Sequence, residues 1–137
     1  DFLKFRQDMS NILMEENRLM EIVKLIGSDV LPDDQKLIIE TARVIRVGFL
    51  QQNAYHKDDT YVPLEKQLKM MGTILNLYHN GQKAVAVGIP IRQIMETGLF
   101  EKVIKVKYDI PNEKLEMFDQ YNNEINQLFQ KLLEQQS

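Results

Sequence analysis

Apolar residues recur three and four positions apart along most of the chain, the spacing that places them on one face of an α-helix. The first such segment covers residues 2–26 and ends in a glycine, which commonly terminates helices. A second covers residues 32–49 and opens with a proline, which suits a first helical turn. A third begins at residue 64 and fades at Gly81 or Gly88. These patterns predict three long amphipathic helices, each with one face to bury.

The rest of the chain predicts shorter elements and one more long helix. A proline opens a short helical segment over residues 91–96. Residues 103–108 alternate at a period of two, but a single strand has no partner, so we interpret them as a short helix or an extended linker. The last long pattern follows Pro111–Asn112. The fold class is therefore predicted to be all-α, a bundle of about five to six helices in a single domain over residues 1–137.

Composition narrows the class of protein. Lys and Arg number 17 against 20 Asp and Glu, and this net charge of −3 argues against nucleic acid as a partner. No apolar run approaches the roughly 18 residues of a membrane helix, so no direct membrane insertion is expected. The absence of Cys suits a reducing, cytoplasmic compartment. Because helical spacing begins at Phe2 after a first residue that is not Met, we expect the sequence to be an excerpt of a longer chain.

The motifs of common enzymes and metal sites do not occur in the sequence. Gly81–Lys83 lacks the glycine-rich lead-in and the following hydroxyl residue of a triphosphate-binding loop. The two histidines lie far apart, which favours surface roles over catalysis. Lys102, Lys105 and Lys107 form a small basic cluster, which we interpret as a solvated face rather than a phosphate site. The sequence therefore offers no catalytic residue and no metal ligand.

Two stretches are more informative. Residues 25–37 (LIGSDVLPDDQKL) form a tight, acidic turn between two predicted helices. Its aspartates have an ordinary interpretation as residues that serve the N-terminus of the following helix. Residues 42–55 end an amphipathic helix in paired amides followed by Tyr55. There the ordinary interpretation is that the amides cap the helix and the aromatic ring packs against the core.

At these residues the sequence closely resembles the C-terminal domain of the catalytic A subunit of V-type and A-type rotary ATPases. The resemblance rests on residues 21–32 (EIVKLIGSDVLP) and on residues 49–55 (FLQQNAY). It covers nearly the whole chain, from about Phe5 to Leu133. Three later short motifs occur in the matching order, residues 58–61, 65–67 and 88–91.

The resemblance implies a helical bundle that follows a nucleotide-binding domain of the same chain and faces the central rotor stalk. Parent subunits of this family alternate with B subunits in a ring and couple ATP hydrolysis or synthesis to rotation and to proton or sodium transport. ATP and Mg²⁺ belong to the preceding domain, so the excerpt alone is expected to hold no cofactor and to hydrolyse no ATP. The implied location is cytoplasmic, in the soluble head at the inner face of the membrane.

The resemblance also assigns roles to the two informative stretches. The acidic turn corresponds to the lever loop of the related F-type catalytic subunit. Because Val30 and Gln35 interrupt the acidic pattern, we expect steric contact with the rotor to matter more than charge. Tyr55 occupies the position of an aromatic residue beside the adenine, where stacking on a base is worth about 1–3 kcal/mol. The implied rotor-contact residues are Asp29, Val30, Leu31, Pro32, Asp33 and Asp34, and the implied adenine rim is Gln52, Asn53, Ala54 and Tyr55.

An alternative from another class stays open. The chain contains seven methionines, which we interpret as core residues, but Met-rich and aromatic faces also suit a free-standing helical adaptor that binds a partner helix. An upstream reading frame containing a phosphate loop would favour the rotary ATPase, whereas a start codon at Asp1 would favour the adaptor.

Overall fold

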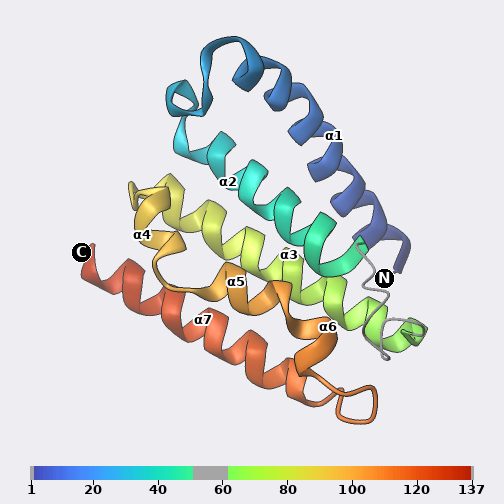
Figure 1. The fold of residues 1–137 in the computed structure, drawn as a ribbon. Coiled ribbons are helices and arrows are strands. Elements are labelled where there is room, and N and C mark those ends of the chain that lie inside the picture. Colours follow the sequence, from blue (N-terminus) through green and yellow to red (C-terminus); the bar gives the residue numbers. More distant parts are fainter. Residues whose placement is uncertain (1, 51–61, 137) are drawn as a thin grey trace.

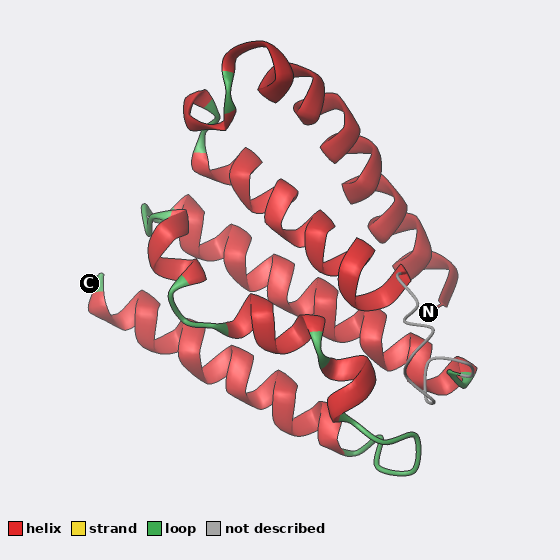
Figure 2. Cartoon of the chain, viewed as in Figure 1, coloured by secondary structure: helices red, strands yellow, loops and turns green. Residues whose placement is uncertain are grey.

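The computed structural model describes residues 2–50 and 62–136, and all regular structure in those ranges is helical, as Figure 1 and Figure 2 show. The predicted all-α class is confirmed. The elements are α1 (Phe2–Ile26), η1 (Ser28–Val30, a 3-10 turn), α2 (Asp33–Arg43), η2 (Val44–Leu50, a π-helix), α3 (Leu64–Ala86), α4 (Ile91–Met95), α5 (Leu99–Ile104), α6 (Val106–Asp109) and α7 (Met117–Gln135).

The long helices lie where the apolar spacing predicts them. Helix α1 has the predicted bounds, and the chain leaves it through Gly27 at a φ of 87°, a backbone conformation that strongly favours glycine. Helix α3 continues through Gly81 and ends at Ala86, shortly before Gly88 at a φ of 96°. The later of the two predicted endpoints is therefore correct.

The region interpreted as a short helix or linker forms two short helices, α5 and α6. Val103, Val106 and Ile110 are all at least 99% buried, and their spacing of three and four residues is helical rather than extended. The helical interpretation is therefore confirmed. These two helices bring the number of α-helices in the described residues to seven, rather than about five to six.

Helix α3 lies at the centre of the arrangement. Helices α1 and α2 form an antiparallel hairpin on one side of α3, and α7 packs along its other side (Figure 1). Helix α5 contacts both α3 and η2, and the short helices α4 to α6 return the chain from the end of α3 to the start of α7 (Figure 1). The main buried core contains residues from α1, α2, η2, α3, α4, α5 and α7.

An uncharged polar seam joins α3 to α7. Nδ2 of Asn76 donates to Oδ1 of Asn122 and of Asn126, each at 3.2 Å. Nδ2 of Asn80 donates to Oδ1 of Asn126 at 3.2 Å and to the carbonyl of Asn76 at 2.9 Å. The carboxamides thus supplement the apolar contact between the two longest packed faces with bonds that carry no net charge.

Helices α2 and α3 approach closely at Gly81. A Cβ atom on this residue would lie 2.8 Å from Cδ1 of Leu37, and the Leu37 side chain is fully buried. Glycine is the residue that fits here, although it lies in the interior of a helix, where it is less favourable than alanine by about 1 kcal/mol. The close packing therefore accounts for the glycine in this helix.

Candidate functional site

The turn between α1 and α2 projects from one end of the bundle (Figure 1). It consists of the η1 turn, the buried Leu31 and Pro32, which forms the N-terminal cap position of α2. Asp29, Val30, Pro32 and Asp34 are exposed. The structure thus places the six predicted turn residues together, with Leu31 anchoring the turn to the core.

Asp33 has a role within the fold. Its Oδ2 atom accepts a hydrogen bond of 3.0 Å from the backbone N–H of Ile91, the first residue of α4. The ordinary interpretation assigned the aspartates to the helix that follows the turn, which is α2, and for Asp33 this is wrong because the carboxylate caps α4. The bond ties the base of the turn to the end of α3 through α4.

The tip of the α1–α2 hairpin is apolar. Leu25 is 84% exposed, Ile26 62% and Val30 57%. The helical spacing predicted Ile26 to be buried, and this is wrong because the turn projects beyond the core. Three large apolar side chains at a projecting turn form the surface that we call the apolar tip (Leu25, Ile26 and Val30).

The predicted adenine rim, Gln52 to Tyr55, lies outside the described residues. Leu50, the last residue of η2, lies two positions before Gln52 in the sequence. The described structure therefore ends where this candidate site begins.

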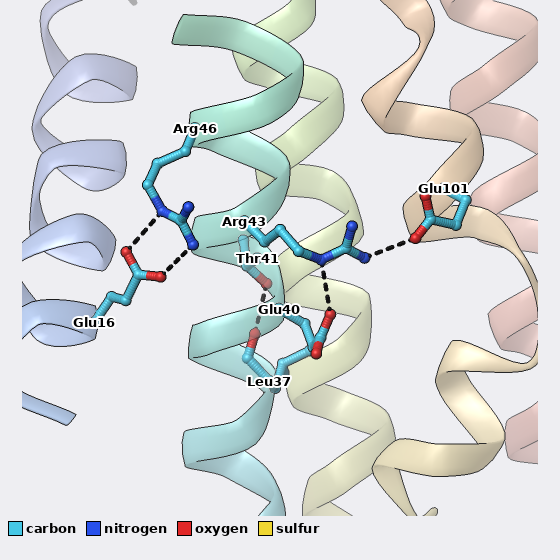
Figure 3. Close-up of polar contacts among 7 residues, drawn as sticks. All are labelled: Glu16, Leu37, Glu40, Thr41, Arg43, Arg46 and Glu101. Atoms are coloured by element: carbon cyan, nitrogen blue, oxygen red, sulfur yellow. Dashed lines mark hydrogen bonds and ion pairs between the residues drawn. The ribbon is translucent and has the colours of Figure 1, made fainter. Parts of the chain in front are cut away.

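Arg43 joins the end of α2 to α5, as Figure 3 shows. Its Nε donates to Oε1 of Glu40 at 3.2 Å, and its Nη2 donates to Oε1 of Glu101 at 2.9 Å. Burial lowers the pKa of the Arg43 guanidinium, but the hydrogen bonds and charges of Glu101 and Glu40 raise it, and the net shift is upward. The cation is thus held between a carboxylate of its own helix and one from α5.

Arg46 joins η2 to α1 on the opposite side (Figure 3). Its Nε and Nη2 donate to the two carboxylate oxygens of Glu16 at 3.1 and 2.6 Å. The side chain of Glu16 is only 8% exposed. Sequence reasoning placed Glu16 in a polar stretch, but it lies four residues after Ile12 and three before Leu19, on the buried face of α1. That register was the available signal.

The π-helix η2 packs its glycine against α5. A Cβ atom on Gly48 would lie 3.1 Å from both the Cα and the carbonyl oxygen of Ile104. These are backbone atoms, which cannot move aside as the end of a flexible side chain can. Contact of the two backbones therefore depends on the absence of a side chain at Gly48.

Gly48→Ala is expected to lower the free energy of unfolding by about 1–3 kcal/mol, because the added methyl group overpacks the contact with Ile104. Urea unfolding of the 137-residue chain measures this change. Gly72→Ala is the matched control, since its Cβ would meet only Phe5 side-chain atoms at 3.5 Å or more. A loss of stability in Gly72→Ala equal to that in Gly48→Ala would contradict the overpacking argument.

Lys66 is a second functional-looking residue that the sequence analysis missed. Only 1% of it is exposed, and its Nζ donates to the carbonyls of Lys107 and Ile110 and to Oδ1 of Asn112 at 2.8, 2.7 and 2.9 Å. These acceptors lie in α6 and just after it. Lys66 precedes the buried Met70 by four residues, so helical register again marked a buried position. The ammonium group organises the connection between α6 and α7.

The predicted basic cluster does not form a common solvated face. Lys107 is 96% buried, so that interpretation is wrong for this residue. Lys102 pairs with Glu124 of α7 and lies 4.8 Å from the ring centre of Tyr121. Met9, Met70 and Met71 are buried in the core, as predicted, whereas Met14 is 65% exposed.

The described residues hold little that could perform chemistry. Within residues 2–50 and 62–136, no three His, Cys, Asp or Glu side chains are grouped as metal ligands. Burial raises the pKa of the Tyr78 hydroxyl, and the charges of Asp34 and Glu15 raise it further, so this phenol stays protonated at neutral pH. Among those residues no helix is long and apolar enough to cross a membrane. The geometry is that of a mechanical or packing element.

Comparison with known proteins identifies the parent of this element. A family model described as the C-terminal domain of V and A type ATP synthase matches residues 1–95. The chain belongs to this family. It is 52% identical over 135 residues to V-type ATP synthase alpha chain 2 of Clostridium tetani, covering 98% of this chain. It is 44% identical over 134 residues to the V-type ATP synthase alpha chain of Halothermothrix orenii, again over 98% of this chain, and 40% identical over 138 residues to the A subunit of the A-type ATP synthase of Methanopyrus kandleri, over 100%.

The resemblance stated from the sequence is thereby confirmed: the chain matches the C-terminal domain of the A or alpha subunit of a V/A-type ATP synthase. The family model covers α1 to α4, and the three relatives extend the similarity over α5 to α7. The chain spans 23% of the length of each of these relatives. The V/A-type C-terminal domain therefore comprises the hairpin, the helix α3 and the α7 layer described above.

Proposed function

We propose that this V/A-type C-terminal domain transmits force between a central rotating stalk and the nucleotide site of the catalytic A subunit. The observation that carries the proposal is the projecting hairpin of α1 and α2, which ends in the apolar tip. A solvent-exposed group of three large apolar side chains suits contact with another protein. The parent protein would thereby couple ATP hydrolysis or synthesis to rotation and to transport of protons or sodium ions.

The construction of the hairpin supports a lever. Helix α1 has 25 residues, and the second arm consists of α2 followed directly by η2. The carboxylates of Asp33, Glu16 and Glu101 tie these arms to α4, to each other and to α5. A hairpin fixed at several points along its length moves as a unit rather than bending at its base.

The nucleotide end of the proposed lever is the rim formed by Gln52, Asn53, Ala54 and Tyr55. We assign Tyr55 to the adenine face, with ATP and Mg²⁺ bound mainly by the preceding domain of the same chain. The other proposed partners are the B subunits of the ring and the stalk. The domain would belong to the ATPase head on the cytoplasmic face of the membrane, and by itself it would not hydrolyse ATP.

Replacing the apolar tip with serines (Leu25→Ser, Ile26→Ser and Val30→Ser) is expected to uncouple ATP hydrolysis from ion transport in the assembled complex. Burial of a large aliphatic side chain stabilises a contact by about 1.5–3 kcal/mol, whereas an exposed ion pair adds about 0.2–1 kcal/mol. The triple variant should therefore reduce the ions transported per ATP hydrolysed far more than Asp29→Asn with Asp34→Asn. The measurement is ATPase activity and ion uptake in the same vesicles.

Met14→Ser provides the matched control, because Met14 is 65% exposed on α1 but lies outside the turn. It should leave the coupling ratio unchanged. Lengthening the turn with glycines should uncouple the complex as the serine variant does. Equal uncoupling by the two aspartate substitutions would show that charge, not steric contact, drives the stalk, and full coupling in the serine variant would remove the tip from the contact.

A further inference from the structure

One uninterrupted helix joins the two proposed functional sites. It begins at Asp33, directly after the turn, and runs through α2 and η2 to Leu50. Gln52, the first residue of the proposed adenine rim, follows two positions later in the sequence. Any rotation or shift of this helix about its axis is therefore passed along the chain from one site toward the other.

The change from α-helix to π-helix sets the register of the second half of this helix. The Oγ1 atom of Thr41 donates to the carbonyl of Leu37 at 2.8 Å just before η2 begins, a type of bond that often bends helices (Figure 3). A turn of π-helix holds more residues than a turn of α-helix and is frequent at functional sites. Conversion of η2 to α-helix would shift later residues by one position, about 100° and about 1.5 Å.

Packing against α5 selects the π register. Gly48 faces the backbone of Ile104 where a Cβ would lie 3.1 Å away. A shift by one position would bring Val47 or Phe49 toward this contact, and both carry a Cβ and larger groups. The contact therefore opposes the shift from one side of η2.

Glu16 and Arg46 oppose the same shift from the other side. Arg46 extends from η2 toward α1, whereas Arg43 extends toward α5 (Figure 3). The two parallel bonds of a guanidinium to a carboxylate fix orientation as well as distance. Because the Glu16 carboxylate is only 8% exposed, water is a poor substitute for Arg46. Rotation of η2 by about 100° would carry Arg46 away from it.

We propose that Glu16 and Arg46 are positioning residues for the nucleotide site, because their ion pair holds η2 in its π-helical register and so directs the chain that continues beyond Leu50. This inference rests on the proposed function. Since Glu16 lies on α1, the first arm of the lever, displacement of the hairpin by the stalk changes the pull on η2. The pair thereby links stalk position to nucleotide affinity.

The test uses the full-length parent protein in complex with its partner subunits. Arg46→Gln and Glu16→Gln should each raise KM for ATP by about 2- to 30-fold, the range found for residues that couple sites without touching ligand. Arg46→Lys keeps the charge but loses the paired geometry, so its KM should be intermediate. Loss of folded enzyme alone would lower the rate per total protein and leave KM unchanged.

Glu15→Gln is the matched control. Glu15 is the neighbour of Glu16 on α1 and also pairs with an arginine, Arg18, but within α1 and away from η2. Its KM should equal that of the unmodified complex. An unchanged KM in both Arg46→Gln and Glu16→Gln, or an equal rise in Glu15→Gln, would overturn the proposal.

Two further measurements separate this inference from the proposed function. Hydrogen exchange of the backbone amides of η2 should accelerate in Arg46→Gln and not in Glu15→Gln, and unchanged exchange would show that the pair does not hold the register. Tyr55→Ala should raise KM through lost stacking. If Tyr55→Ala raises KM and Arg46→Gln does not, the positioning role is wrong and the adenine rim stands. If neither raises KM, the proposed adenine rim itself is wrong.

Discussion

Lys66→Met should lower the free energy of unfolding by about 2–4 kcal/mol, because it leaves buried acceptors without their donor. Methionine keeps most of the length of the side chain, so the loss comes from the ammonium group rather than from a cavity. The carbonyls of Lys107 and Ile110 would lose bonds of 2.8 and 2.7 Å. Urea unfolding of the 137-residue chain gives the change in midpoint and slope.

Lys69→Met is the control for this substitution. Lys69 lies on the same helix, α3, but it is half-buried rather than buried. Its replacement should change the free energy of unfolding by no more than about 0.5 kcal/mol, as surface substitutions usually do. Near-equal stability of Lys66→Met and the unmodified chain would show that the α6–α7 connection does not depend on the ammonium group.

Leu37→Ala should lower the free energy of unfolding by about 2–5 kcal/mol, the range for leucines removed from well-packed cores. The close approach at Gly81 makes a second substitution informative. In the unmodified chain Gly81→Ala should destabilise, because overpacking by about 1–3 kcal/mol exceeds the helix-propensity gain of about 1 kcal/mol. In the Leu37→Ala background the same change should stabilise, because the methyl group then enters space that Leu37 has vacated.

The sign reversal is measured by a double-mutant cycle in urea. Gly72→Ala combined with Leu37→Ala is the control, because a Cβ at Gly72 would meet Phe5 and not Leu37. Its effect should be the same in both backgrounds. A destabilising Gly81→Ala in the Leu37→Ala background would place the conflict at some contact other than Leu37.

Much of the fold follows from local signals. The bounds of α1 were predictable because apolar spacing and Gly27 agree, and the start of α2 because a proline precedes two acidic residues. The ends of α5 and α6 were not, since residues 103–108 satisfy both a period of two and a helical spacing. Burial of Val103 and Val106 by helices distant in sequence decides between them.

The charged residues of the core show what a single sequence conceals. Glu16 and Lys66 lie in register with buried apolar neighbours, but a charge at such a position is stable only if a partner reaches it. Those partners, Arg46 and the carbonyls after α6, are 30 and 41 or more residues away. The π-helical register of η2 is hidden for the same reason, because the contact of Gly48 with Ile104 selects it. The role of the turn was readable from family resemblance, but its apolar tip was not.

The polar seam of Asn76, Asn80, Asn122 and Asn126 gives the two sides of α3 different responses to ionic strength. Dissolved ions screen charges within about 10 Å at 0.1 M salt and leave bonds between carboxamides largely unaffected. The ties of η2 to α1 and of α2 to α5 are ionic and partly exposed, whereas the α3–α7 contact is not. Salt would therefore loosen the lever while its foundation keeps its strength, so the cell's ion content sets how stiffly the hairpin is mounted.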